Sequence, residues 1–193
     1  MTRIWLIRHG KPVDEVAGRC YGSLDVALSD TGRQQMAHVA EFLKTEPISA
    51  VYTSPLSRAL ESARVIASDF KVIPDFREMN FGELEGLTYD EIAVRYPDIY
   101  RDWTKVRFPG GESLADMRQR VLRAFDAICR DRENQTVAIA SHGGVNRILI
   151  AWALQIPDSC IFRLAQDYAA VNLFTLTDGV PCVRSTNVNL SLL

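Results

Sequence analysis

The chain has 193 residues, of which 47% are hydrophobic and 24% are charged, a composition typical of a folded globular protein. This length favours a single domain that buries a sizeable core. The formal net charge of −2 argues against a surface that coats nucleic acid or binds an anionic membrane. Four widely spaced cysteines and three histidines disfavour a structural zinc site.

Reduced thiols in a cytoplasmic protein are the simplest interpretation of these cysteines. No signal peptide is expected, because Arg3 and Arg8 enclose too few apolar residues. The longest apolar run, residues 148–154, is too short to span a bilayer.

The first feature in chain order is an apolar run, residues 4–7, followed by Arg8, His9 and Gly10. A nearly continuous apolar run is typical of a strand that is covered on both faces. A glycine just past a strand lets the backbone turn sharply and lets a ligand approach closely. The cation and the imidazole favour a phosphate site, but a basic strand end that meets water fits these three residues equally well.

The connection that follows, residues 11–30, is polar and rich in turn-forming residues. Connections of this length inside compact domains are often functional. The stretch Cys20-Tyr21-Gly22-Ser23 combines an aromatic ring, a flexible glycine and a hydroxyl group. Ser29 is predicted to cap an amphipathic helix whose apolar stripe reaches Leu43.

Residues 50–53 predict a second strand, and Ser54-Pro55 predicts the start of the next helix. Arg58 then lies near the N-terminus of that helix, where a cation opposes the helix dipole. A surface ion pair with Glu61 or Glu46 would balance this charge. A bound anion would balance it as well.

The middle of the chain is less regular. Val72-Ile73 predicts a short strand, and residues 75–86 predict a loop that carries three glutamates. Thr88 and Glu91 form a capping box that opens a short helix. Residues 96–108 interleave aromatic and basic side chains, which could stack on a nucleobase or pack as a flap on the core.

The last part of the chain repeats the layout of the first. Ser113 with Asp116 predicts the start of a long helix, and residues 136–140 predict a further apolar strand. That strand ends in Ser141-His142-Gly143-Gly144 and is followed by another helix. Residues 171–175 and 182–184 predict two closing strands joined by a turn at Asp178-Gly179.

Strands that alternate with helices predict an α/β fold, a three-layer α/β/α sandwich around a mostly parallel sheet. Ligands in such folds bind beyond the carboxyl ends of the strands. Arg8 with His9, Arg58, and His142 follow three different strands, so we expect them to meet there. Two arginines suit a phosphate dianion, one imidazole can attack phosphorus, and the other can stabilise the developing charge. A carboxyl group from the 75–86 loop would then protonate the leaving oxygen and activate water.

Several motifs occur together in the order of a known family. They are Leu6-Ile7-Arg8-His9-Gly10, Ser54-Pro55-Leu56-Ser57-Arg58-Ala59, Arg77-Glu78 with Phe81-Gly82 and Glu85-Gly86, Gly110-Gly111-Glu112-Ser113, and Ser141-His142-Gly143-Gly144. Over nearly its whole length the chain resembles the histidine phosphatase superfamily, which has the phosphoglycerate mutase-like fold. The resemblance implies one domain over residues 1–193, with a flap-like insertion around residues 76–112.

The resemblance also implies roles for the site residues. His9 matches the nucleophile of the family, while Arg8, Arg58 and His142 match its phosphate pocket. Glu78 matches the general acid and base. Glu83 is its local rival, because composition alone does not choose between the two glutamates.

Two features resemble the phosphatase branch rather than the mutases, namely the short chain and the Gly110-Gly111-Glu112-Ser113 motif. Cys20-Tyr21-Gly22 with Asp25-Val26 resembles the α-ribazole phosphatases, which act on a nucleotide-like substrate. Tyr21, Gly22, Ser23 and Gly143 are therefore expected to bind substrate. Glu15 stands where many relatives have a pocket asparagine, so we expect it to point away from the phosphate or the loop to differ.

The leading hypothesis is a metal-independent phosphomonoesterase of the histidine acid phosphatase type. It would hydrolyse a small phosphorylated metabolite, such as α-ribazole 5′-phosphate, through a phosphohistidine. No cofactor, metal, nucleic acid or membrane partner is expected. The alternatives are a cofactor-dependent, phosphoglycerate mutase-type transfer and a non-catalytic binder of a phosphorylated ligand. The oligomeric state is open, with a homodimer as one option.

Overall fold

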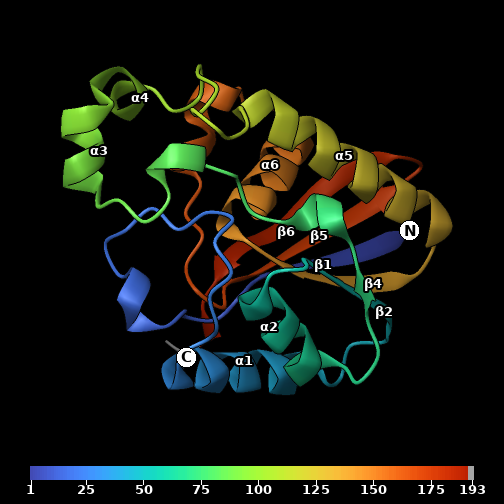
Figure 1. The fold of residues 1–193 in the computed structure, drawn as a ribbon. Helices are drawn as coiled ribbons and strands as arrows, with labels where there is room; N and C mark the ends of the chain where they lie inside the picture. The colour runs from blue at the N-terminus through green and yellow to red at the C-terminus, as the bar shows by residue number, and fades with distance from the viewer. Residues whose placement is uncertain (191–193) are drawn as a thin grey trace.

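The computed structural model describes residues 1–190 and is built on a six-stranded sheet with the order β3-β2-β4-β1-β5-β6 (Figure 1). The strands are β1 (Thr2–Arg8), β2 (Ile48–Thr53), β3 (Lys71–Val72), β4 (Thr136–Ser141), β5 (Val171–Thr177) and β6 (Val180–Val188). The first four in this order run parallel, and β5 is antiparallel to both β1 and β6. The predicted mostly parallel sheet is confirmed.

Helices cover both faces of the sheet (Figure 1). One face carries α1 (Asp30–Leu43) and α2 (Ser57–Ile66), and the other carries α5 (Leu114–Asp131) and α6 (Gly143–Leu154). Two short helices, α3 (Tyr89–Arg95) and α4 (Pro97–Arg101), lie beyond the carboxyl ends of the parallel strands. Four 3₁₀ turns complete the chain, at Asp14–Val16, Pro74–Phe76, Gly82–Leu84 and Asp158–Arg163. The α/β/α sandwich expected from the sequence is therefore confirmed.

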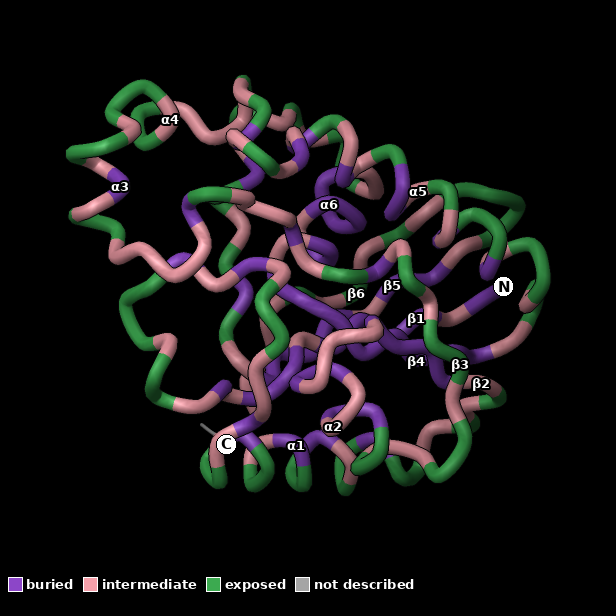
Figure 2. The backbone as a smooth tube through the Cα atoms, viewed as in Figure 1, coloured by how far each residue is buried: buried purple, intermediate pink, exposed green. Residues whose placement is uncertain are grey.

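The central strands contribute to a hydrophobic core on each face. In β1, Ile4 and Leu6 join the core beneath α5 and α6, while Trp5 and Ile7 join the core above α1 and α2. Figure 2 shows that the buried part of the backbone is concentrated in these strands. Burial on both faces explains why the sequence of this strand is one continuous apolar run.

The predicted starts of three helices are confirmed. Ser29 caps α1 with its side chain, and capping boxes open α3 at Thr88 with Glu91 and α5 at Ser113 with Asp116. In each case a side-chain oxygen accepts from an otherwise unpaired backbone N–H in the first turn. These helix starts depend on neighbours three residues away, so the sequence is sufficient to locate them.

The predicted start of α2 at Ser54-Pro55 is wrong. The helix begins at Ser57, and its N-cap residue Leu56 makes no side-chain cap. The hydroxyl oxygen of Ser54 accepts from the backbone N–H of Leu56 at 3.3 Å and also lies 2.6 Å from Nε2 of His142, at the end of β4. Ser54 therefore contacts a residue that is distant in the chain, and helix-capping preferences do not predict such a contact.

The close approach expected at Gly10 exists, but the neighbour is a helix. A Cβ atom on Gly10 would lie 2.3 Å from the carbonyl oxygen of Gly32 in the first turn of α1. The absence of a side chain lets the end of β1 pack against α1. The contact with α1 is therefore the close approach that requires a glycine at this position.

Two properties concern residues 1–190 as a whole. Over this range, no helix has both the length and the apolar character needed to cross a membrane. Across the same residues, no group of three or more His, Cys, Asp or Glu side chains is placed to hold a metal ion. All four cysteines are free thiols.

Candidate active site

Three residues that follow different strands meet at the carboxyl edge of the sheet. His9 comes directly after β1, His142 directly after β4, and Arg58 is the second residue of α2. Their exposed fractions are 1%, 0% and 0%, respectively. The centroids of the two imidazole rings are 5.2 Å apart. The predicted convergence of these residues is thus present in the fold.

His9 is held in one tautomer. Its Nδ1 lies 2.7 Å from the carbonyl oxygen of Gly10, which can only accept, so Nδ1 carries the proton. Nε2 therefore has the lone pair and accepts from Nε of Arg58 at 3.2 Å. Burial, together with the charges of Arg58 and Arg8, lowers the pKa of His9 well below its usual value of 6.5. The ring is neutral at pH 7 and presents a lone pair.

Arg58 is buried and held by backbone groups. Its two terminal nitrogens donate to the carbonyl oxygens of Leu24 at 2.7 Å and Gly22 at 2.6 Å. Within residues 1–190, no carboxylate lies within ion-pair distance of it. The alternative of a surface pair with Glu61 or Glu46 is wrong, because both glutamates pair with other arginines. The charge of Arg58 is left available to an anion.

Two buried nitrogens in this site, Nε of Arg8 and Nδ1 of His142, have no hydrogen-bond partner. Arg8 donates through Nη1 to the carbonyl of Gln166, and its guanidinium lies 4.1 Å from the ring centroid of Tyr168. Burial and the neighbouring arginines lower the pKa of His142, so its ring is also neutral. An unsatisfied buried polar group costs about 1–3 kcal/mol, so these two nitrogens together indicate a site for an anion.

Glu78 reaches the N-terminus of α6. Its Oε2 accepts from the backbone N–H of Gly144 at 3.0 Å, and its Oε1 accepts from that of Met79 at 2.9 Å. A Cβ atom on Gly144 would lie 2.3 Å from Oε1 of Glu78, so this approach requires glycine. Glu83, in contrast, is exposed and accepts from the hydroxyl of Tyr96 at 3.0 Å. Only Glu78 of these two lines the cavity described next.

A buried ion pair holds the backbone on both sides of Glu78. Arg120 on α5 donates to the carboxylate of Glu112 at 2.9 and 2.6 Å and to the carbonyl of Arg77 at 2.8 Å. The same carboxylate accepts from the N–H of Asn80 at 2.9 Å. The pair thus ties the segment that carries Glu78 to a long, well-packed helix.

A cavity of about 640 Å³ opens beside these groups, and Tyr21 and Gly22 line it. Gly22 has a φ of +23°, and a Cβ atom there would lie 2.4 Å from the carbonyl oxygen of Met79. Ser23 does not line the cavity, because its hydroxyl donates to Oε1 of Glu85 at 2.8 Å. The structure therefore brings Tyr21 and Gly22 to the cavity, whereas Ser23 bonds to Glu85 outside its lining.

Gly143 and Glu15 differ in their relation to the site. A Cβ atom on Gly143 would lie 3.0 Å from Nη1 of Arg147 and 3.4 Å from Nε of Arg8. The glycine therefore lets two guanidinium groups approach the start of α6. Glu15 is exposed in a 3₁₀ turn and does not line the cavity, which is consistent with a side chain that points away.

Sequence reasoning missed Arg147 and Tyr168. Arg147 lines the cavity and donates through Nε to the carbonyl of Leu164 at 2.8 Å, and burial lowers its pKa. It follows Gly143 by four residues, so helical periodicity places both on one face of α6 and could have revealed it. No local pattern identifies Tyr168, whose hydroxyl lies 3.1 Å from that of Tyr21.

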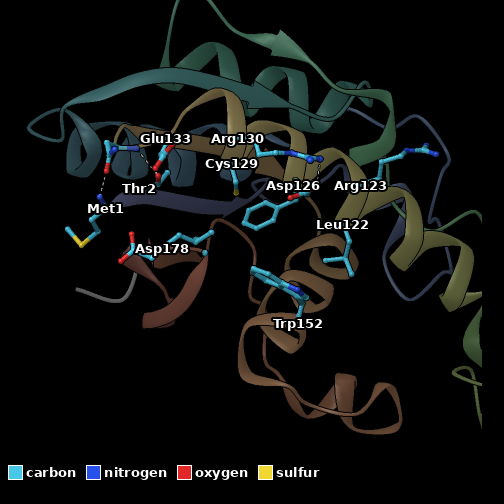
Figure 3. A pocket seen from close by; sticks show the side chains of 14 residues that line it. Met1, Thr2, Leu122, Arg123, Asp126, Cys129, Arg130, Glu133, Trp152 and Asp178 are labelled. Carbon is cyan, nitrogen blue, oxygen red and sulfur yellow. Dashed lines mark hydrogen bonds and ion pairs between the residues drawn. The ribbon is translucent and has the colours of Figure 1, made fainter.

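A second cavity, of about 530 Å³, lies at the opposite end of the strands (Figure 3). It is lined by the start of β1, by α5 and by Trp152 near the end of α6. Its charged groups include Arg130 and Asp126, which form an ion pair with each other. It contains none of the site residues predicted from the sequence.

Comparison with known proteins identifies the class that this fold and site define. The family model of the Histidine phosphatase superfamily (branch 1) matches residues 4–189. The chain belongs to this superfamily, which confirms the family expected from its motifs.

Individual relatives fall within the same class. The chain is 30% identical over 200 residues to phosphoserine phosphatase 1 of Hydrogenobacter thermophilus, with 100% of this chain and 95% of that protein covered. It is 35% identical over 195 residues to the bifunctional protein Rv2228c of Mycobacterium tuberculosis, with 96% of this chain and 54% of that protein covered. The chain thus spans about half the length of the mycobacterial relatives it matches. The crystal structure of the α-ribazole phosphatase from Shigella flexneri matches with a TM-score of 0.89 at 27% identity, covering 97% of this chain and 96% of that one.

Proposed function

We propose that the chain is a phosphomonoesterase that hydrolyses a small phosphorylated metabolite through a phosphohistidine at His9. The observation that carries this proposal is the buried, neutral His9, whose Nε2 lone pair lies 3.2 Å from Nε of Arg58. In the same pocket, Nε of Arg8 and Nδ1 of His142 lack partners that phosphoryl oxygens would supply. Membership of the superfamily supports the same chemistry.

A second nucleophile in the cavity is a poor candidate. Cys20 lines the same cavity, but burial raises the pKa of its thiol to about 12. A thiol with this pKa is protonated at neutral pH and reacts slowly. His9 needs no deprotonation, because its Nε2 already carries the lone pair.

In the first step, Nε2 of His9 attacks phosphorus, an N–P bond forms, and the P–O bond to the leaving group breaks. Arg8, Arg58 and His142 bind the phosphoryl oxygens and stabilise the charge of the transition state. With the hydroxyl of Ser54 donating to its Nε2, His142 presents Nδ1–H as a donor. A protonated Glu78 gives its proton to the leaving oxygen.

In the second step, Glu78 accepts a proton from water, the water oxygen attacks phosphorus, and the N–P bond breaks. Inorganic phosphate leaves, and both His9 and Glu78 return to their starting states. The N–H of Gly144 at the N-terminus of α6 donates to Oε2 of Glu78 and holds this carboxyl group in place.

The finer parts of the proposal concern substrate and organisation. We propose α-ribazole 5′-phosphate as a substrate, on the basis of the similarity to the Shigella flexneri enzyme and of Tyr21 and Gly22 in the cavity. Metal independence, the histidine acid phosphatase type and a cytoplasmic location belong to the same proposal. So does the single domain with its flap-like insertion at 76–112, although residues 191–193 lie outside the described part.

The test compares the wild type with His9→Ala. The wild type is expected to hydrolyse p-nitrophenyl phosphate and to form an acid-labile, base-stable phosphoryl label. The variant is expected to lose activity by about 10⁴-fold or more and to take no label. Robust hydrolysis by the variant would contradict the mechanism. Isomerisation of a phosphoglycerate with a bisphosphorylated primer would identify a mutase, and phosphate binding with neither label nor turnover would identify a binder.

A further inference from the structure

Aromatic rings form the walls of the 640 Å³ cavity beyond the phosphate-facing residues. They come from the 76–112 segment and from the 3₁₀ turn at Asp158–Arg163, which lie far apart in the chain. Besides Tyr21, the rings are Phe81, Tyr89, Tyr100, Trp103, Phe108 and Phe162. The cavity therefore has a charged end, formed by Arg8, Glu78 and Arg147, and a largely aromatic body.

Exposed aromatic side chains gather at this cavity. Among residues 1–190, four aromatic side chains are exposed, and three of them, Tyr89, Tyr100 and Phe162, line it. The fourth, Phe42 on α1, packs edge-to-face on Trp5 at a ring-centroid distance of 5.6 Å. Exposed apolar area is unfavourable in water, and its concentration in one hollow indicates a surface that a ligand covers.

Trp103 is the centre of this aromatic group. Its ring centroid lies 5.3 Å from that of Phe81, 5.6 Å from that of Phe108 and 6.4 Å from that of Tyr89. The first two contacts have the edge-to-face geometry that aromatic pairs prefer, so they fix the orientation of the indole. Trp103 is half-buried, which leaves part of its ring available to the cavity.

The charged groups of the cavity do not suit an ammonium group. Along the described lining, Glu78 is the only carboxylate, and its oxygens accept from the N–H groups of Gly144 and Met79. The cationic Arg147 lies with its Cζ 6.0 Å from the ring centroid of Phe162. A substrate such as an amino-acid phosphate would bring its ammonium group to a lining that already holds two guanidinium groups, those of Arg8 and Arg147.

We infer that the leaving group of the natural substrate carries a planar aromatic or heteroaromatic ring, which stacks on the walls formed by Trp103, Tyr100 and Phe162. The inference rests on the proposed function, since it names the substrate class of the same site. Stacking of one ring on an aromatic side chain is expected to raise kcat/KM by about 10- to 100-fold. Amino-acid and hydroxy-acid phosphates are then poor substrates.

The deciding experiment compares three phosphomonoesters of primary alcohols. They are 2-phenylethyl phosphate, 2-cyclohexylethyl phosphate and O-phosphoserine. The first two differ in the planarity of the ring and little in apolar bulk. We expect kcat/KM for the phenyl ester to exceed that for the cyclohexyl ester about 10-fold and that for phosphoserine by more. Equal values for the two ring esters, or a preference for phosphoserine, would overturn the inference.

A pair of variants locates the effect. Trp103→Leu keeps apolar bulk and removes the planar surface, so kcat/KM for the phenyl ester is expected to fall about 10-fold, and the value for phosphoserine by clearly less. Phe42→Leu, on the far side of the fold, is the matched control and should change neither value. If Trp103→Leu lowered kcat/KM for the phenyl ester and for phosphoserine equally, Trp103 would have a structural role and the inference would be contradicted.

Binding separates this inference from the proposed function. The dissociation constants of 3-phenylpropyl phosphonate and 3-cyclohexylpropyl phosphonate, measured by calorimetry, require no turnover. Tighter binding of the phenyl compound without any hydrolysis or phosphoenzyme would leave the planar-ring inference standing and the proposed phosphatase function refuted. A phosphoenzyme at His9 with equal binding of the two phosphonates would support the proposed phosphatase function and refute the planar-ring inference.

Discussion

The two cavities of this protein are similar in size and differ in their charges. The cavity at the carboxyl ends of the strands, about 640 Å³, is lined by Arg8 and Arg147. Its lining has a single carboxylate, Glu78, in the described residues. The cavity at the amino ends, about 530 Å³, has Arg130 on its wall, and this cation is paired with a neighbouring carboxylate. Volume alone therefore does not mark the site. Positive charge without a carboxylate partner among the described residues does, because its desolvation cost is recovered only when an anion binds.

The direction of the strands and helices produces this difference. Because β4 is followed by α6, the N-terminus of that helix lies at the carboxyl edge of the sheet, where the N–H of Gly144 meets Glu78. Trp152, near the end of the same helix, lines the other cavity. Helix N-termini carry partial positive charge and attract anions, whereas C-termini do not. The electrostatic potential in each cavity thus depends on which end of α6 faces it.

The largest contrast between the cavities is expected from two arginine substitutions. Arg58→Met removes a buried cation beside His9, and kcat/KM for p-nitrophenyl phosphate should fall by about 10³- to 10⁵-fold. Arg130→Met, at the amino-end cavity, removes an exposed cation paired with Asp126 and should leave kcat/KM within about twofold of the wild type. Similar losses in both variants would show that the cavities do not differ as described.

Substitution of the two rival glutamates should give a smaller effect. Glu78→Gln removes the proposed proton donor and should lower kcat about 10²- to 10³-fold for alkyl phosphates. The loss should be smaller for aryl phosphates, whose leaving groups need less protonation. Glu83→Gln is the matched control, since Glu83 is exposed and bonded to Tyr96. Steady-state kinetics would refute the assignment if Glu83→Gln proved the more damaging change.

The buried ion pair behind Glu78 is expected to affect stability more than any charge at the amino-end cavity. Arg120→Met leaves Glu112, which is 9% exposed, without its partner, and the free energy of unfolding should fall by about 3–5 kcal/mol. Arg130→Met breaks an exposed pair and should cost less than about 1 kcal/mol. Urea unfolding measures both values. Equal costs would show that the buried pair does not hold the segment around Glu78.

The two buried histidines predict a modest dependence of stability on pH. The pKa values of His9 and His142 are lowered in the folded state, so below about pH 6.5 the unfolded state binds protons first. Their contribution is complete above that pH and is lost as the pH falls, by up to about 1.4 kcal/mol per unit for each histidine. Urea unfolding between pH 7.5 and 5.5 checks this. His142→Asn should reduce the slope by up to one proton. A wild-type stability that is flat over this range would exclude the prediction.

The sequence by itself determined the fold class and the meeting of His9, Arg58 and His142. Each of these residues follows a strand that is recognisable from its apolar run, and parallel strands bring their carboxyl ends to one edge of the sheet. The helix starts at Ser29 and Thr88 were likewise local, because a cap depends on residues three positions away. These features require no knowledge of contacts between distant parts of the chain.

The tertiary structure alone decided how the side chains of the site are positioned and which further residues they contact. The contact of Ser54 with His142, the position of Glu78 against α6 and the stacking of Arg8 on Tyr168 join residues that are far apart in the chain. The aromatic wall around Trp103 has the same origin, since its rings come from separate segments. Composition and periodicity describe neighbours along the chain, whereas these contacts depend on how loops pack after the sheet has formed. For this reason the charged end of the cavity was visible in the sequence, whereas for the aromatic 96–108 segment the sequence left stacking on a ligand and packing on the core as alternatives.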